Sequence, residues 1–391
     1  MGLKKKGNFR KIINTLHLWL GLPSGLIVFI VGITGALFVF EEEGRQLFQH
    51  EYYHVQNVGT ERLSVKQMTD TFKVHYPKDK ITSIRFTEEK DAAFIFISKK
   101  DFAVSIDPYT AKIIGVRNLD KDFFSVVQEL HTHLLMGKVG NEIIRWNVLI
   151  FFIMCISGLI LWWPKQKRFF KQAATINFKT RNFKRFNWDL HSVLGFYALA
   201  VLLIISSTGL FWMFDTTKKI VGFITNSPVP KKEDKIKSAH TSGKRYAMDS
   251  AYYYMAAIYP GAKETFLTPA SDSAAPIRIL MRYPYSIVRK QNTLYFDQYS
   301  GKVLKAELYK NYTGYDNVAK SNYDFHTGRI RVLGIGSKII YFLVALMAAS
   351  LPITGFLIWW GKRKKNTKAN LRMKQFENLS HRDSLEKMSE V

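Results

Sequence analysis

The chain has 391 residues, and its 57 Lys and Arg against 31 Asp and Glu give a formal net charge of +26. Hydrophobic residues make up 47% of the chain and aromatic residues 14%, which excludes an intrinsically disordered protein. The single cysteine, Cys155, excludes a disulfide scaffold, an iron–sulfur cluster and a cysteine-based zinc site. Because the apolar residues are concentrated in four long runs, a simple soluble enzyme is excluded as well.

The four apolar runs predict four membrane spans, at 12–40, 143–163, 190–214 and 338–360. Each reaches the roughly 20 residues that a helix needs to cross about 30 Å of hydrocarbon. The first run is too long for the apolar part of a cleaved signal peptide, so we expect a retained signal anchor. All eight tryptophans lie in or beside these runs, as expected for rings that favour the membrane interface.

The positive charge lies mainly in residues 1–11, in the loop 164–189 and at the beginning of the tail 361–391. With four spans these segments share one side of the membrane, which the positive-inside rule assigns to the cytoplasm. Both termini are then cytoplasmic, and the loops 41–142 and 215–337 lie outside. Topology and contact with membrane lipid explain the basic clusters. Since no recognition motif accompanies the charge, we expect no nucleic-acid binding.

Similar motifs recur in both halves of the chain in the same order, which predicts a tandem duplication. The pairs include His17-Leu-Trp-Leu-Gly21 with His191-Ser-Val-Leu-Gly195, Thr34-Gly35 with Thr208-Gly209, His131-Thr132 with His326-Thr327, and Ser157-Gly158 with Thr354-Gly355. Each half consists of a span, an outer domain and a second span. The expected fold is a membrane α-helical protein, a four-span helix bundle from a tandem duplication, with two outer α+β domains.

The outer loops show alternating patterns typical of small α+β domains. The first predicts a helix at 64–76 and strands at 81–87, 92–98, 102–107 and 112–116. The second predicts a helix at 246–258 and strands at 276–282, 291–297 and 301–306, after a linker at 226–245 that is rich in Lys, Ser, Pro and Gly.

Four of the ten histidines are related in pairs by the duplication. His17 and His191 lie near the cytoplasmic ends of spans one and three, where an ionisable group tends to face the bundle interior and to be functional. His131 and His326 precede spans two and four and are expected on short helices or turns at the outer side. For His17 and His191, the alternative is a side chain that reaches the inner membrane interface or bonds a neighbouring helix. For His131 and His326, the alternative is a histidine on the surface of an outer loop.

Two imidazoles on facing helices suit the axial positions of a haem iron, whereas zinc prefers four protein ligands, or three and a water. No Cys-x-x-Cys-His motif is present, so any haem would be bound non-covalently, as b-type haem. The sequence therefore predicts a cytoplasmic-side haem on one pair and an outer haem on the other. His133 is an alternative ligand to His131, and Arg145 and Lys338 are candidates to pair with haem propionates or to anchor the spans at the interface.

On these motifs the chain resembles the PepSY-associated transmembrane family of bacterial inner-membrane proteins. The resemblance lies in His17-x3-Gly21 with Thr34-Gly35-Ala36, in Leu130-His131 with Leu134-Leu135-x-Gly137, in Phe325-His326-Thr327-Gly328, and in the turns that begin at Asp107 and Asp297. It implies that the outer domains are periplasmic PepSY domains. It also implies that His17, His191, His131 and His326 are the axial ligands of two haems, as in ferric-siderophore reductases similar to this family.

We therefore expect an inner-membrane oxidoreductase that passes electrons outward and reduces a ferric siderophore or similar ferric chelate. Because the chain carries no fused flavin domain, its electron donor is expected to be another molecule, a quinol or a cytosolic flavoprotein. One alternative is a cofactor-free protein whose PepSY domains restrain a protease or sense a ligand. A second alternative is an accessory protein for siderophore or haem transport.

Overall fold

The computed structural model describes residues 2–230, 236–239 and 246–389, so most of the predicted linker at 226–245 lies outside the described residues. The chain forms two compact units. The bundle unit comprises residues 1–36, 132–207 and 342–391, and the sheet unit comprises residues 37–131 and 208–341.

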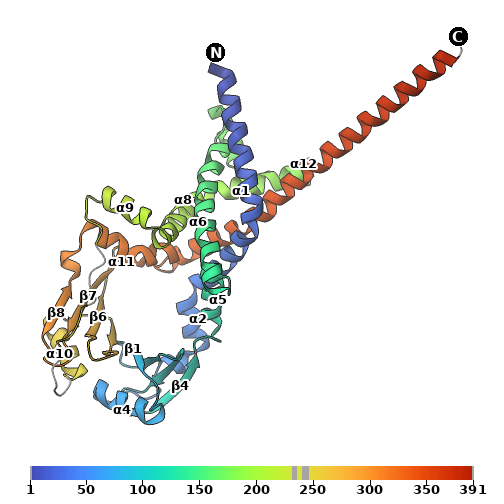
Figure 1. Cartoon of the computed structure of the whole chain (residues 1–391). Helices are drawn as coiled ribbons and strands as arrows, with labels where there is room; N and C mark the ends of the chain where they lie inside the picture. Colours follow the sequence, from blue (N-terminus) through green and yellow to red (C-terminus); the bar gives the residue numbers. More distant parts are fainter. Residues whose placement is uncertain (1, 231–235, 240–245, 390–391) are drawn as a thin grey trace. The chain divides into compact units, whose positions relative to one another are not determined.

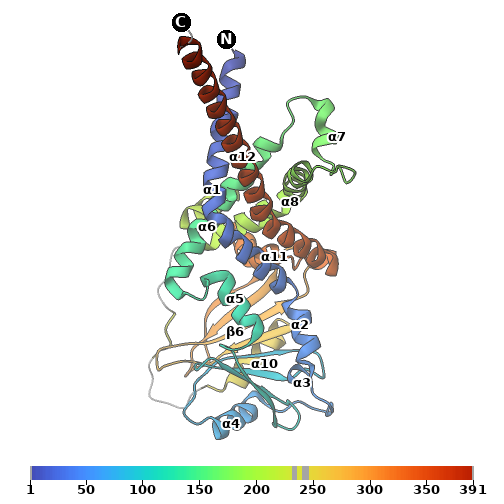
Figure 2. The same cartoon turned by 90° about the vertical axis from the view of Figure 1, so that its right-hand side faces the viewer.

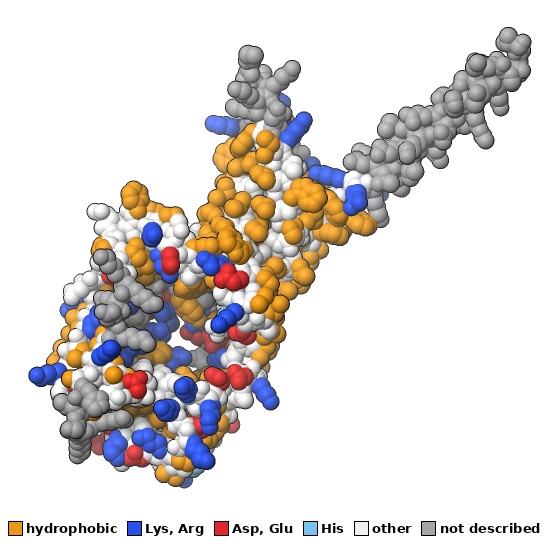
Figure 3. Space-filling model, in the orientation of Figure 1, with side chains coloured by type: hydrophobic (Ala, Val, Ile, Leu, Met, Phe, Trp, Pro, Cys, Tyr) orange, Lys and Arg blue, Asp and Glu red, His pale blue; other side chains and the backbone are white. Residues whose placement is uncertain are grey.

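Four helices in the described chain are long and apolar enough to cross a membrane, as predicted. They lie within α1 (Gly2–Val39), α6 (Gly137–Trp162), α8 (Phe183–Met213) and α12 (Ile335–Ser389). On the face shown in Figure 3, hydrophobic side chains cover these helices, whereas charged side chains are concentrated on the sheet unit. An apolar helix surface of this kind is stable against lipid and not against water.

Small residues let the helices of the bundle unit approach closely. Cys155 of α6, Ala198 of α8 and Ala348 of α12 belong to one buried cluster. A Cβ added at Gly32 of α1 would lie 3.0 Å from the backbone nitrogen of Ala349, so α1 and α12 are in backbone contact there.

The sheet unit contains one antiparallel sheet with the strand order β4-β3-β2-β1-β5-β6-β7-β8. Its strands are β1 (Ile81–Thr87), β2 (Phe94–Ser98), β3 (Phe102–Ile106), β4 (Ile113–Asn118), β5 (Glu264–Thr268), β6 (Ile277–Tyr283), β7 (Lys290–Phe296) and β8 (Val303–Glu307). Strands β1 and β5 pair, with Ile84 opposite Leu267. The two predicted outer domains therefore share one sheet, which leaves no unpaired strand edge between them.

Helices α4 (Val65–His75) and α10 (Met248–Ile258) cover the same face of this sheet (Figures 1 and 2). Phe72 of α4 and Met255 of α10 are fully buried, together with strand residues such as Ile84, Phe96 and Ile279. Both helices and seven of the eight strands lie close to the predicted ranges. Strand β5 was missed, although it follows Tyr259-Pro260 much as β1 follows Tyr76-Pro77.

The remaining helices are short, and most were not predicted. They are α2 (Glu41–Phe48), α3 (His50–Tyr53), α5 (Phe123–His133), α7 (Phe170–Ala173), α9 (Asp215–Ile224) and α11 (Gly314–Thr327), with 3-10 turns at Lys167–Phe169, Tyr309–Asn311 and Arg331–Leu333. Helices α5 and α11 carry His131 and His326, in agreement with the expected short helices.

Asp249 of α10 caps α4, which belongs to the other half of the chain. Its carboxylate accepts hydrogen bonds from the backbone N–H of Val65, at 2.6 Å, and of Lys66, at 3.0 Å. Since removing a helix cap costs about 1 kcal/mol, we expect Asp249→Ala to lower the thermal unfolding temperature of the sheet unit by several degrees. Asp70→Ala, at an exposed ion pair of the same helix, is the control. If both variants unfolded at the same temperature, the proposed stabilisation of α4 by Asp249 would be contradicted.

Candidate functional site

His131 on α5 and His326 on α11 face each other within the sheet unit. The centres of their rings are 6.2 Å apart, and the ring planes are inclined by 74°. A metal–nitrogen bond of about 2 Å on each side, plus roughly 1.2 Å from each nitrogen to its ring centre, gives about 6 Å for two imidazoles on one iron. The observed separation therefore fits two axial ligands of a haem.

Contacts in the sheet unit fix the ring of His326. Its Nδ1 lies 2.9 Å from Oγ1 of Thr208, and the Trp212 ring packs edge-on against it with centres 4.9 Å apart. The backbone carbonyl of Thr208 in turn accepts a hydrogen bond from Nδ2 of Asn322, at 3.0 Å. Because Nδ1 is occupied by the hydroxyl, Nε2 is the nitrogen that a metal would bind.

The second pair, His17 and His191, lies in the bundle unit, where each histidine meets a hydroxyl on a neighbouring helix. Nδ1 of His17 is 2.8 Å from Oγ of Ser157, and Nδ1 of His191 is 2.9 Å from Oγ1 of Thr354. The His191 nitrogen also lies 3.1 Å from the carbonyl oxygen of Leu351. The two imidazoles are near enough to interact electrostatically.

The partners of Nδ1 indicate the tautomer of these histidines. The carbonyl oxygen of Leu351 can only accept, so Nδ1 of His191 carries the hydrogen and Nε2 keeps its lone pair. For His17, a Ser157 hydroxyl that donates to the carbonyl of Met154, at 3.1 Å, accepts from Nδ1 in the same way. A neutral imidazole with its lone pair on Nε2 is the form that binds a metal.

Glycines beside the hydroxyls make room for the rings. A Cβ added at Gly158 would lie 3.5 Å from Cε1 of His17, and one at Gly355 would lie 3.2 Å from Cε1 of His191. Gly21 and Gly195, which follow His17 and His191 by four positions, meet other side chains. The nearest atom to an added Cβ is the methyl of Met154 for Gly21, at 2.7 Å, and a methyl of Leu351 for Gly195, at 3.6 Å.

The three further candidates for the cofactor site, His133, Arg145 and Lys338, each contact a neighbouring polar side chain. Nδ1 of His133 lies 2.7 Å from the hydroxyl of Thr132, and Arg145 pairs with Glu142 at 3.3 Å. Lys338 pairs with Glu42 at 2.9 Å and with Glu43 at 2.7 Å.

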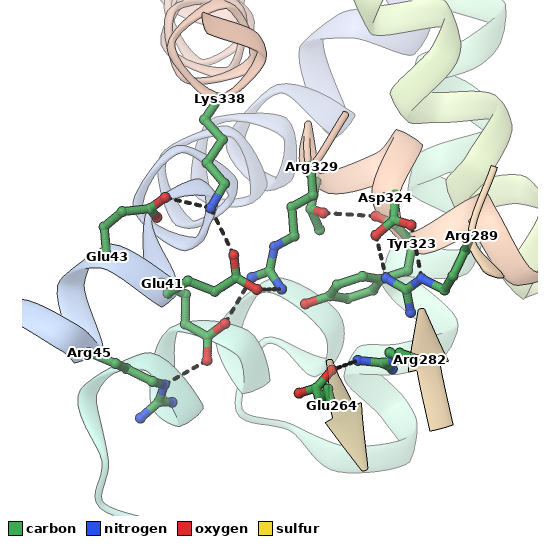
Figure 4. A network of polar contacts seen from close by, with 12 residues as sticks. Glu41, Glu43, Arg45, Glu264, Arg282, Arg289, Tyr323, Asp324, Arg329 and Lys338 are labelled. Atoms are coloured by element: carbon green, nitrogen blue, oxygen red, sulfur yellow. Dashed lines mark hydrogen bonds and ion pairs between the residues drawn. The ribbon is translucent and has the colours of Figure 1, made fainter. Parts of the chain in front are cut away.

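Lys338 belongs to a charge network of the sheet unit (Figure 4). Arg329 bonds Glu41 and Glu42, each at 2.9 Å, and so connects α2 with the segment that follows α11. Burial would raise the pKa of Glu42, but the charges of Arg329 and Lys338 lower it below its usual value. The network holds together two segments that lie between 287 and 296 positions apart in sequence.

The arrangement offers pairs of imidazoles and no larger ligand set. Among the residues whose side chains the structure describes, no group of three or more His, Cys, Asp or Glu is placed to hold a metal ion. Sequence reasoning found the four histidines but missed Ser157, Thr354 and Thr208, which bind them. Their signal was present in the repeated pairs Ser157-Gly158, Thr354-Gly355 and Thr208-Gly209.

Four helices capable of crossing a membrane, together with a separate antiparallel sheet, define a polytopic membrane protein. The family model for the PepSY-associated TM region matches residues 15–362. The chain belongs to this family, as its motifs predicted. A comparison with curated proteins gave no match.

Proposed function

We propose that this protein is a b-type di-haem oxidoreductase of a bacterial inner membrane, which delivers electrons to a ferric siderophore or similar ferric chelate in the periplasm. The separation of 6.2 Å between the rings of His131 and His326 carries the proposal. The contacts at Nδ1 of His17 and His191 support it, because they engage one ring nitrogen and leave Nε2 as the nitrogen for a metal.

Bound haem would supply one-electron transfer, which requires no acid–base residues on the protein. His17 and His191 would hold one group within the bundle unit, and His131 and His326 would hold the other within the sheet unit. The hydroxyls of Ser157, Thr354 and Thr208 would orient three of the four imidazoles. Reduction weakens the chelate because hard oxygen ligands prefer the ferric ion.

The proposal includes the origin and orientation of the chain. A tandem duplication accounts for the matched order of elements around β1 and β5, and the outer domains would be periplasmic PepSY domains. Both termini would be cytoplasmic, since the basic segments share one side. Each half then contributes one histidine to each pair.

Optical spectroscopy of the purified protein tests the proposal. We expect a b-type α band in the reduced-minus-oxidised spectrum and two haems per chain by pyridine haemochrome assay. The reduced protein should be reoxidised by a ferric hydroxamate, with one ferrous ion released per electron. A colourless preparation from haem-replete cells would contradict the proposal and favour a regulatory protein, while uptake of labelled chelate without reductant would indicate a transport accessory.

Removing the hydroxyl of Ser157 and removing that of Thr354 are expected to affect haem binding unequally. Ser157→Ala should weaken haem binding at His17 by roughly 10–100-fold, the usual cost of losing a partner of a metal-bound histidine. Thr354→Val should cost less, because the carbonyl of Leu351 still accepts from His191. Titration of the apoprotein with haem measures both, with Ser350→Ala as control. An equal loss in all three variants would show that the hydroxyls do not position the rings.

A further inference from the structure

A groove in the bundle unit lies between α1 and α6, apart from the histidines. Its volume is about 700 Å³, within the range of roughly 300–1,000 Å³ typical of small-molecule sites. Pro23, Ser24 and Ile27 line it from α1, and Trp146, Asn147 and Ile150 line it from α6. The lining residues Trp146 and Val139 are 55% and 61% exposed, so the groove opens on the surface of the bundle unit, which lipid would cover.

Asn147 is the exceptional residue of this groove. Its side chain is buried, with only 6% of the residue exposed, yet no donor in the described part of the chain bonds its Oδ1. The residue lies four positions inside the apolar run that begins at Ile143, or about 6 Å along the helix axis. An unpaired amide oxygen is costly at this depth, where water does not satisfy it.

The chemistry of the groove selects its occupant. An acyl chain would fill the apolar lining but cannot donate a hydrogen bond to Asn147. A quinol is a flat apolar ring with two hydroxyl donors and an isoprenoid tail that remains in lipid. Ser24 offers a second acceptor, because its hydroxyl donates to the carbonyl of Leu20 and keeps its lone pairs. We propose that this groove binds an isoprenoid quinol, with Asn147 accepting a hydrogen bond from one hydroxyl.

The rim of the groove provides an exit for protons. Lys138 and Glu142 line its end near the start of α6, and the Glu142 side chain is 57% exposed. Oxidation of one quinol breaks two O–H bonds and yields the quinone, two protons and two electrons. The protons leave to water at this rim. If the proposed function holds, the two electrons reduce two ferric ions, one electron each.

Binding is tested with a redox-inert quinol analogue that carries a hydroxyl donor, 2-nonyl-4-hydroxyquinoline N-oxide. Quenching of its fluorescence by the full-length protein in nanodiscs gives the Kd. We expect Asn147→Leu to raise the Kd about tenfold or more, as loss of a buried hydrogen bond predicts. Ile27→Phe, which fills the groove, should do the same. Ser206→Ala, at a buried hydroxyl of α8 outside the groove, should leave the Kd unchanged.

Electron delivery is tested separately with decylubiquinol and menaquinol-4 under anaerobic conditions. Either quinol should reduce the wild-type haems, and Asn147→Leu should slow this at least about tenfold while dithionite still reduces both haems. Haem-loaded protein that binds no analogue, or an Asn147→Leu variant with wild-type affinity, overturns the quinol site and leaves the proposed function intact. If Asn147→Leu lost haem, the quinol site would be overturned too, because the groove would then be part of a haem site. Colourless protein with Asn147-dependent analogue binding supports the site while refuting the electron-transfer role.

Discussion

Replacing His326 with alanine is expected to leave the purified protein with one haem in place of two and to abolish reduction of a ferric chelate. The reason is that His131 faces His326 at the separation that one iron between two imidazoles requires. The loss of haem affinity should exceed the roughly 10–100-fold that follows when a metal-bound histidine loses its hydrogen-bond partner, because here the ligand itself is removed. His17→Ala should remove the other haem, so that the double variant is colourless.

Haem content per chain and the rate of ferrous release with a trapping reagent measure this effect. His75→Ala, at an exposed histidine on α4, should retain two haems and the wild-type rate. His133→Ala should also retain both, because His131 is the histidine whose ring lies opposite His326. A His326→Gly variant that regains its spectrum with added imidazole would separate loss of a ligand from misfolding. Two haems in His326→Ala would refute the assignment.

The spans and the main helices and strands were predictable because their signals are local. A run of about 20 apolar residues is visible without knowledge of its neighbours, and α4 shows a complete capping box at Ser64 and Gln67. The second span was predicted from Ile143, but its helix begins at Gly137. The first turns of α6 carry Lys138, Asn141 and Glu142, which give no hydrophobic signal.

Features that depend on distant partners were not predictable in this way. Strand β5 has only five residues, and its pairing with β1 joins the two halves of the chain. The pair of Arg329 with Glu42 joins residues 287 positions apart. The histidine pairs were found because similar motifs around them recur in both halves of the sequence. Their hydroxyl partners were missed because a Ser-Gly or Thr-Gly pair in a span is usually read as helix packing.

Asp122 is expected to stabilise the sheet unit in a way that depends on pH. Its side chain is 1% exposed, and its two oxygens accept from both terminal nitrogens of Arg45, at 3.0 and 2.7 Å. Burial alone would raise the pKa of Asp122, but the hydrogen bonds and charge of Arg45, with a hydrogen bond from Gln49, lower it to about 2. Breaking a buried ion pair of this kind costs about 3 kcal/mol or more, so Asp122→Asn should lower the melting temperature markedly at pH 7.

The sign of the pH dependence follows from the direction of this shift. A carboxyl with a pKa lower in the folded than in the unfolded state stabilises the fold above its unfolded value of about 3.9. That contribution, roughly 2 kcal/mol, disappears as the pH falls towards 2. The difference in melting temperature between the wild type and Asp122→Asn should therefore be largest near neutral pH and shrink below pH 4. Asp70→Asn, at a pair whose carboxylate is half exposed, should show little difference at any pH, because exposed ion pairs contribute little. If the gap between the wild type and Asp122→Asn stayed constant from pH 7 to pH 3, the ion pair with Arg45 would not be the source of the stabilisation.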